Sequence, residues 1–594
     1  MRAGAFVAVL AACFVPALAS ADPPHAITDL DDARACLPLQ AGGVAVATGG
    51  GLAVVSPDGR VHTLTALEGL PDTRAYAIAA DGDALWIGTE AGAARVTLTP
   101  ELAVRRTVAL AGAPVHAVIT TSTGVYFGTW GAGLLRLRAG DDTPEVVPAV
   151  GGGMRISALA QYGGSLYVAY ADAALVRIDA GQFPATLDTP AAAQALSTIT
   201  TADGQTGLLL GDIEGLFRVA DGVTPIAPVD VRGLAQGPAG TLLVATYGSG
   251  LLAGPLHGAL RREAGVPAFV NGVSSRGAVT CAATPEGVFV QAGGGGYERV
   301  ALGVIPSNDV TVLADDGGGR VAVGTFDRGA VRIEGNSVSP VPGLEPAEVI
   351  NAAAWQGAGA SATLWLGSAH GLIRVPPSGP PRRFRASDGL PSSFVRSIFV
   401  QSDGRVLVGT DEGAAWVEGN RVVRLTPAPK AGPTPLASPA HATWALAESE
   451  DGTVWLGTNV GLYFGKGGSF RRLSLSTGDL RDDWVTALVV RGADVFVGTY
   501  AGGVTHLRAP HRGGFTLEHA DLGGGCINPG GLTIDGDNLL AATMEGLLLR
   551  PAGDDRAAWA PRTQAAPGRD VTAVRRVGDM LWVGSRRGIG VTRP

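Results

Sequence analysis

The sequence predicts an all-β protein built as two tandem seven-bladed β-propellers with four-stranded antiparallel blades. The main observation is a short phrase that recurs along the chain, as in "ALWIGTEAGAARV" at 84–96 and "TVWLGTNVGLYFG" at 453–465. The second is the abundance of Gly (88 of 594 residues), which indicates many tight turns between short strands. The third is composition: apolar residues make up 46% of the chain and charged residues 16%, so it can bury a core.

Each clear repeat contains the parts of one blade. An alternating run such as "VTALVV" at 485–490 leads to a turn, then to a second run ending in Gly-Thr, a Gly turn and a third run. A weaker fourth run usually precedes the next unit, and four antiparallel strands in roughly 41 residues match a propeller blade. The residue in the Thr position of "GT" marks fourteen units: Thr48, Thr89, Thr129, Tyr170, Asp212, Thr246, Ala292, Thr325, Ser368, Thr410, Thr458, Thr499, Thr543 and Ser585.

The repeated phrase has a physical reason. The large apolar residue of "WIG" is expected to pack against the neighbouring blade, because a single blade cannot bury both of its faces. The next Gly is expected where blades crowd together, and the Gly of the turn where a side chain would block the backbone shape.

Fourteen blades exceed the usual four to eight of one ring, so two rings of seven are expected. The spacing falls to 33 residues between Ala292 and Thr325, which places the boundary near residue 303. The predicted rings are therefore 22–303 and 304–594. Residues 25–30 ("HAITDL") are predicted to complete blade seven, and residues 302–306 to complete blade fourteen, so that each ring closes.

The N-terminus predicts export. Residues 1–21 combine an early Arg, an apolar run and small residues before a cleavage point at Asp22, which is typical of a secretory signal peptide. A lipoprotein attachment at Cys13 is an alternative. No later run is long and apolar enough to predict a membrane helix, so a periplasmic or extracellular protein is expected.

Three cysteines remain after such cleavage: Cys36, Cys281 and Cys526. An odd number allows at most one internal disulfide, and the spacing excludes a zinc ribbon. Cys36 and Cys281 are predicted on the innermost strands of blades one and seven, which become neighbours when the ring closes. The alternatives are a disulfide between them or two buried thiols.

Two units resemble a known repeat family. "EGLPDTRAYAIAADGDALWIGTEAGAARV" (68–96) and "DGLPSSFVRSIFVQSDGRVLVGTDEGAAWV" (388–417) are similar to the two-component regulator propeller repeat, through a "GLP" loop, a turn with Asp and Gly, and a "W-I/L-G-T-x-x-G-L" strand pair. The resemblance covers most of residues 36–592. It implies paired seven-bladed propellers of the kind found in the periplasmic sensor half of hybrid two-component receptors, which often respond to carbohydrates.

The sequence differs from such receptors in the regions that would transmit a signal. It contains no kinase or response-regulator region and no small β-sandwich after the last repeat. The resemblance therefore implies a ligand- or partner-binding fold and supplies no signalling output.

Four repeats have a turn that is one residue longer and begins with an aromatic residue. These turns and the "GLP" loops leave each blade on the same face of the ring. Aromatic side chains there could bind sugar or peptide groups, or each could cover its own blade edge. The predicted ligand-binding residues are those four aromatics and three residues near the mouth of the second ring: Trp130, Tyr247, Phe326, Tyr500, His370, Trp444 and Trp484.

No metal or cofactor site is expected. The Asp-Gly pairs lie at hairpin turns and lack the alternating oxygen ligands of a calcium loop. His506, His511 and His519 lie near one another in sequence without a metal-binding pattern. No nucleophile elbow, phosphate loop or carboxylate pair is found. The Asp-Gly turns are at Asp81, Asp203, Asp403, Asp451 and Asp535.

The leading functional hypothesis is an exported, non-enzymatic protein that binds carbohydrate, peptide or another envelope protein. The net charge of -8 and the absence of a basic run argue against nucleic acid. Two alternatives remain: a propeller lyase or hydrolase acting on polysaccharide, and an envelope scaffold. The fold by itself does not choose among them.

Overall fold

The computed structural model describes residues 24–148, 154–171, 175–179, 184–200, 204, 206–220, 222–335, 337–425, 441–466, 469–508, 515–523 and 525–594. The expected signal peptide with Cys13, the Asp203 turn and His511 lie outside the described residues. The described chain forms strands and four short 3-10 helices, and none of these helices has the length and apolar character required to cross a bilayer. The helices are η1 (Leu110–Gly112), η2 (Pro238–Gly240), η3 (Gly359–Ser361) and η4 (Ala386–Asp388).

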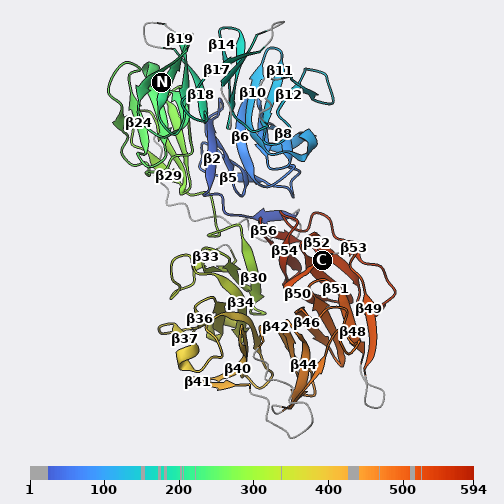
Figure 1. Ribbon diagram of the computed structural model, residues 1–594. Coiled ribbons are helices and arrows are strands. Elements are labelled where there is room, and N and C mark those ends of the chain that lie inside the picture. The colour runs from blue at the N-terminus through green and yellow to red at the C-terminus, as the bar shows by residue number, and fades with distance from the viewer. Residues whose placement is uncertain are drawn as a thin grey trace. The chain divides into compact units, whose positions relative to one another are not determined.

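Fourteen four-stranded antiparallel sheets confirm the predicted fold class. Two compact units divide them, one spanning Asp29–Gly303 and the other joining residues 24–28 to Val304–Pro594. Each unit holds seven sheets, which are called blades 1–7 of the first ring and blades 8–14 of the second ring (Figure 1).

The first ring runs in sequence order. Its strands, blade by blade, are β2 (Ala33–Pro38), β3 (Val44–Thr48), β4 (Gly51–Val55) and β5 (Val61–Leu64); β6 (Ala75–Asp81), β7 (Ala84–Thr89), β8 (Gly92–Thr97) and β9 (Ala103–Val108); β10 (Val115–Thr121), β11 (Gly124–Thr129), β12 (Leu134–Leu137) and β13 (Glu145–Val146); β14 (Ile156–Tyr162), β15 (Ser165–Tyr170), β16 (Leu175–Ile178) and β17 (Ala185–Leu187); β18 (Ala195–Thr200), β19 (Thr206–Gly211), β20 (Leu216–Val219) and β21 (Val223–Ala227); β22 (Val231–Gln236), β23 (Leu242–Thr246), β24 (Leu251–Gly254) and β25 (Arg261–Arg262); β26 (Gly272–Arg276), β27 (Val279–Thr284), β28 (Gly287–Ala292) and β29 (Glu298–Val300).

The second ring takes one strand from the N-terminus. Its strands are β30 (Val310–Asp315), β31 (Arg320–Thr325), β32 (Ala330–Glu334) and β33 (Ser337–Pro340); β34 (Ile350–Gln356), β35 (Thr363–Ser368), β36 (Gly371–Val375) and β37 (Arg382–Phe384); β38 (Val395–Val400), β39 (Val406–Thr410), β40 (Gly413–Glu418) and β41 (Arg421–Arg424); β42 (Thr443–Glu448), β43 (Val454–Thr458), β44 (Gly461–Lys466) and β45 (Ser469–Leu473); β46 (Val485–Arg491), β47 (Asp494–Thr499), β48 (Val504–Arg508) and β49 (Thr516–Ala520); β50 (Ile527–Asp535), β51 (Asn538–Thr543), β52 (Gly546–Pro551) and β53 (Ala560–Pro561); β54 (Val571–Val577), β55 (Met580–Ser585), β56 (Gly588–Thr592) and β1 (His25–Ile27).

The recurring phrase packs neighbouring blades against each other, as predicted. Trp86 of blade 2 is 2% exposed and meets Phe127 of blade 3 edge-on, with ring centroids 5.3 Å apart. A Cβ on Gly88 would lie 2.6 Å from the carbonyl oxygen of Val115 in the next blade. Gly92 has φ +126°, a conformation that a residue with a side chain rarely adopts. Blades therefore pack against their neighbours through the phrase.

The structure adds a role for the Thr of "GT". In twelve blades the hydroxyl of this Thr or Ser donates to the carbonyl oxygen of the Gly that ends the following turn, as from Thr89 to Gly92 at 2.8 Å. Asp212 replaces it in blade 5 and accepts from the backbone N–H groups of Glu214 and Gly215. The side chain thus closes the turn between the second and third strands.

The predicted closure of both rings was wrong. Residues 25–27 do not join blade 7 but form β1, which pairs with β56 and supplies the outer strand of blade 14; Figure 1 shows the blue strand beside β56. Blade 7 already has a local outer strand in β29, whereas blade 14 consists of β54, β55 and β56 together with β1. Residues 302–306 form no strand; instead Leu302 packs into the first ring and Ile305 into the second.

The register mark in blade 7 was also wrong. Ala292 ends the third strand, β28, and the residue equivalent to the other marks is Thr284, whose hydroxyl donates to Gly287 at 2.8 Å. The short interval of 33 residues between Ala292 and Thr325 therefore arises because the register position of blade 7 is Thr284 and not Ala292. Because of this shift, Cys281 lies on the second strand of blade 7, β27, while Cys36 lies on the innermost strand of blade 1.

Closure of the first ring brings blades 1 and 7 together. Cys36 and Cys281 form a disulfide there, with Cα atoms 6.2 Å apart and a sequence separation of 245. The amide of Asn271 also donates to the carbonyl oxygen of Ala33 at 2.8 Å. In the second ring, the Thr572 hydroxyl of blade 14 donates to Val310 of blade 8 at 2.7 Å. Both rings are thus closed by specific bonds between the first and last blades.

Candidate functional site

One face of each ring carries most of the exposed apolar side chains. In every blade the second strand ends, and the first strand begins, on the same face, which is called the GT face below. Eight of the nine large apolar residues that are exposed in the described chain lie in turns or connections on this face. They are Trp130, Met154, Ile213, Tyr247, Phe269, Phe326, Leu475 and Met544; the ninth, Val146, lies on the fourth strand of blade 3.

The first strands of neighbouring blades contact one another around the centre of each ring, and the end of this circle on the GT face is called the mouth. Twelve of the fourteen first strands have a β-bulge at or near their start, and the bulge turns a side chain out of the regular pairing. In the second ring several of these side chains bond the next blade. The carbonyl oxygen of Val395, for example, accepts from the Asn351 amide at 2.9 Å.

Three predicted site residues form one row at the mouth of the second ring. The rings of Trp484 and Tyr500 stack with centroids 4.5 Å apart and 19° between planes, and Trp444 meets Trp484 at 5.3 Å. The Arg396 guanidinium lies 3.8 Å from the centre of the Trp444 ring and is ion-paired with Asp411. The row spans blades 10–12 and is half-buried, so the structure brings together residues that are 104 positions apart in sequence.

A similar row in the first ring includes Trp130. The His116 ring lies between Tyr76, at 4.3 Å, and Trp130, at 3.9 Å, so both of its faces are covered. Arg34 lies 4.5 Å from the centre of the Tyr76 ring, and the Tyr76 hydroxyl donates to Glu90. Burial lowers the pKa of His116 to about 4, so its imidazole is neutral at pH 7. The stack joins blades 1–3.

Tyr247 and Phe326 are more exposed than the rows, at 56% and 50%. Tyr247 lies against Phe269 of the next connection, with ring centroids 4.7 Å apart, and Arg232 lies 4.8 Å from the Tyr247 ring centre. Arg586 lies 5.6 Å from the centre of the Phe326 ring. Part of the ring surface of Tyr247 and of Phe326 is therefore exposed to solvent.

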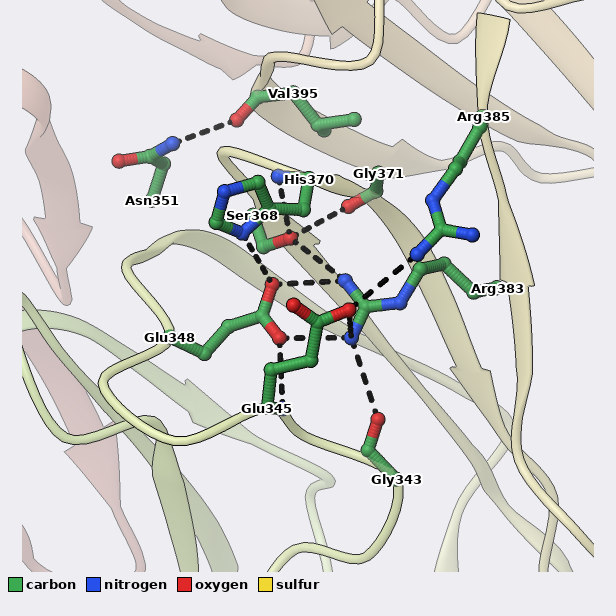
Figure 2. Close-up of polar contacts among 10 residues, drawn as sticks. All are labelled: Gly343, Glu345, Glu348, Asn351, Ser368, His370, Gly371, Arg383, Arg385 and Val395. Carbon is green, nitrogen blue, oxygen red and sulfur yellow. Dashed lines mark hydrogen bonds and ion pairs between the residues drawn. The ribbon is translucent and has the colours of Figure 1, made fainter. Parts of the chain in front are cut away.

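The seventh predicted residue, His370, follows β35 in blade 9, outside the row of blades 10–12, and lies beside the ion pair of Glu348 and Arg383 (Figure 2). Glu348 is 1% exposed and accepts two hydrogen bonds from Arg383, at 2.8 and 2.7 Å. The Nδ1 atom of His370 is 3.5 Å from Glu348 Oε1, and the backbone N–H of Glu345 donates to Glu348 Oε2 at 3.0 Å. The pair ties the connection before blade 9 to the outer strand of that blade.

Glu345, Glu348 and His370 are close enough to share a cation. Both carboxylate oxygens of Glu348 are, however, already held by the Arg383 guanidinium, whose positive charge opposes a metal ion at the same place. The donor set therefore fits a structural ion pair better than a metal centre, and no metal chemistry is derived from it.

The ion pair predicts a pH-dependent loss of stability. Burial alone would raise the pKa of Glu348, but hydrogen bonds from Arg383 and Ser368 outweigh burial and lower the pKa to about 2. A carboxyl group whose pKa is lower in the folded than in the unfolded state stabilises the fold at pH values above its unfolded pKa. This stabilisation is lost as the pH falls towards the folded pKa. We expect Glu348→Gln to destabilise the second ring by about 2–3 kcal/mol at pH 7 and by much less at pH 2.5.

Urea unfolding of both proteins at the two pH values measures this difference. Glu345→Gln, which removes an exposed neighbouring carboxylate, is the control and should have little effect. An equal deficit for Glu348→Gln at pH 7 and pH 2.5 would contradict the assigned cause.

A buried ionic cluster was not predicted from sequence. His506 and His519 lie on neighbouring strands of blade 12, but His506 bonds Asp555 of blade 13 at 2.9 Å rather than a second histidine. Arg508 and Arg550 also bond Asp555, and Arg550 and His506 are each 1% exposed. The cluster joins two blades from positions about 49 residues apart, a distance at which no local motif reveals it.

Comparisons with solved structures agree on the fold. PorZ, described as an essential bacterial surface component of the type-IX secretion system of Porphyromonas gingivalis, matches with a TM-score of 0.73 at 13% identity, covering 96% of this chain and 87% of that one. An ancestral GH74 enzyme matches with a TM-score of 0.69 at 12% identity, covering 97% and 99%. At such identities these similarities establish the fold alone.

The structural neighbours also include extracellular domains of putative hybrid two-component systems from B. thetaiotaomicron. The BT4673 domain matches at 14% identity over 96% of this chain and 82% of that one, with a TM-score of 0.38, which is too low to support an argument. No family model and no curated protein matches the chain. The site must therefore be judged from its own residues.

Proposed function

We propose that the chain is an exported, non-enzymatic binding protein that takes a carbohydrate or another envelope component on the GT faces of its rings. The observation that carries the proposal is that, of the nine exposed large apolar side chains in the described part of the chain, eight lie on these faces. A contiguous exposed apolar patch, such as the pair that Tyr247 and Phe269 form with ring centroids 4.7 Å apart, marks a place where a partner or ligand binds.

The chemistry of these faces favours carbohydrate. The arginines beside the exposed aromatic side chains are already paired with carboxylates. Arg232, near Tyr247, pairs with Asp230. Arg586, near Phe326, pairs with Asp309. A sugar presents an apolar C–H face for an aromatic ring and hydroxyl groups for planar polar side chains. Paired charges leave such a surface without a strong preference for an ionic ligand.

Export rests on the signal sequence expected at residues 1–21. The resemblance to sensor-type propeller repeats agrees with a role in sensing or binding. PorZ, which has the same fold, is described as a bacterial surface component. A surface or periplasmic location and a carbohydrate ligand together form the proposed function.

The test is binding of the mature protein to an oligosaccharide panel, followed by calorimetry on the best ligand. Combined Tyr247→Ala, Phe269→Ala and Phe326→Ala substitutions are expected to weaken binding at least about tenfold, as loss of exposed aromatic anchors does elsewhere. Val146→Ala is the matched control, because Val146 is 67% exposed but not on a GT face.

Equal weakening by Val146→Ala, or no binding to any member of the panel, would contradict the proposal. Release of shorter oligosaccharides on incubation would instead favour the alternative of a propeller hydrolase or lyase.

A further inference from the structure

The bonds around the mouth of the second ring are interrupted at one place. Side chains at a bulge, or directly after it in blade 10, bond the first-strand carbonyl of the next blade between blades 8 and 9, 9 and 10, 10 and 11, 13 and 14, and 14 and 8. The donor and acceptor pairs are Thr311 and Ile350, Asn351 and Val395, Ser397 and Thr443, Asn528 and Val571, and Thr572 and Val310.

At blades 11 and 12 the bulge residues are Trp444 and Thr486. The Thr486 side chain is fully buried, yet its hydroxyl has no hydrogen-bond partner among the described residues. The indole N–H groups of Trp444 and Trp484 also lack an acceptor in the described chain. The gap in the bonded circle thus leaves three buried donors without a partner among the described residues: two on indole rings with centroids 5.3 Å apart, and one on the residue two positions after Trp484.

Unused buried donors need an explanation. Each costs about 1–3 kcal/mol relative to a bonded group, so folded proteins usually supply a partner, a water or a ligand. Unbonded indole N–H groups also occur at Trp86 and Trp582 on second strands and at Trp416 on a third strand. Among the described residues, only Trp444 and Trp484 combine an unbonded indole N–H with a place at the mouth, where Thr486, two residues after Trp484, is also unbonded.

We propose that this gap is a binding site for one unit of a neutral sugar, whose ring oxygens and hydroxyls accept from Trp444, Trp484 and Thr486. Tyr500, stacked on Trp484 at 4.5 Å, adds aromatic surface at the edge of the site. The inference rests on the proposed carbohydrate function and names the subsite and its ligand class.

The charges nearby favour a neutral ligand over an anionic one. Asp482 and Asp483 precede Trp484 in sequence, and Asp411 pairs with Arg396 beside Trp444. These carboxylates outnumber the guanidinium groups of Arg396 and Arg481. An acidic sugar would therefore meet net repulsion, whereas hydroxyl groups can accept from the donors and also donate to carboxylates.

Substitutions that remove a donor but keep an aromatic ring, or keep the shape of the side chain in the case of Thr486→Val, test the site. Trp444→Phe, Trp484→Phe and Thr486→Val are each expected to weaken binding of the best neutral hexasaccharide, drawn from β-1,4-glucan, xylan and mannan fragments, by about 3- to 10-fold in Kd. Two controls occupy equivalent chemistry elsewhere: Trp416→Phe, which removes an unused N–H on blade 10, and Thr572→Val, which removes a bonded hydroxyl on blade 14.

Stability without ligand gives a second readout. Thr572→Val breaks a bond and should lower the unfolding temperature, whereas Thr486→Val removes an unbonded hydroxyl and should leave it unchanged or raise it. A drop for Thr486→Val equal to that for Thr572→Val, with sugar binding unchanged, would overturn the inference in favour of a water-bonded hydroxyl.

The remaining outcomes separate the inference from the proposed function. Undiminished sugar binding by all three variants, with loss on Tyr247→Ala and Phe269→Ala, would overturn this subsite and leave the proposed function standing. Wild-type binding only to acidic oligosaccharides or peptides would overturn the neutral-sugar assignment while keeping a binding role. No wild-type binding to any probe would overturn both.

Discussion

Replacing Asp555 by asparagine is expected to destabilise the second ring by about 3–5 kcal/mol, because it leaves buried arginine charge without its counter-charge. Asp555 accepts from His506 at 2.9 Å, from Arg508 at 2.5 Å and from Arg550 at 3.1 Å. Arg550 is 1% exposed, and burial lowers its pKa. The neutral amide cannot offset this charge and has one acceptor oxygen in place of two.

The same cluster has a pH signature. Burial would raise the pKa of Asp555, but the bonds from His506 and Arg508 outweigh it and lower the pKa below its usual value. The stabilisation is therefore present above the ordinary carboxyl pKa and is lost as pH falls through the folded value. Asp555→Asn should remove this part of the acid sensitivity.

Urea unfolding and hydrogen exchange at blades 12 and 13 measure the effect. Asp554→Asn is the matched control, since Asp554 is adjacent in sequence but exposed and bonds only the backbone of Arg556. Equal destabilisation by both substitutions would show that the Asp555 cluster contributes no more to the free energy of unfolding than an exposed carboxylate does.

Removing the Cys36–Cys281 disulfide is expected to destabilise the first ring by about 2–5 kcal/mol. The bond closes a segment of 245 residues and joins the first blade to the last. Without it, the ring depends on packing and on side-chain bonds such as Asn271 to Ala33 to hold its ends. Most of the effect is expected from the greater freedom of the unfolded ring.

The double substitution Cys36→Ala and Cys281→Ala should lower the unfolding temperature of one calorimetric transition and leave that of the other ring unchanged. Cys526→Ala in the second ring is the control, because Cys526 is a free thiol. Reduction of the wild type should reproduce the double variant. A first ring equally stable with and without the bond would refute the latching role.

Some residues of the candidate sites could be predicted from the sequence and others could not. Trp444, Trp484 and Tyr500, which the structure brings together, could be named as candidates from the sequence because each is a large aromatic residue at a repeat position near the mouth. Phe269 and Thr486 were missed, since Phe269 precedes a weak repeat and Thr486 is an ordinary strand residue. Its importance appears only when the bonded circle around the ring is known.

The sequence by itself determined the all-β class, the four-stranded blades and their packing, because period-2 alternation and Gly turns recur in every unit. These features depend on contacts within a blade or with the next one, about 41 residues away. The tertiary structure alone decided how the rings close. Strand β1 pairs with β56 across more than 560 residues, and any exposed blade edge could have accepted it by backbone hydrogen bonds. Pairing of that kind uses groups common to all residues, so no local pattern specifies it, and only the unfilled edge of blade 14 selects the partner.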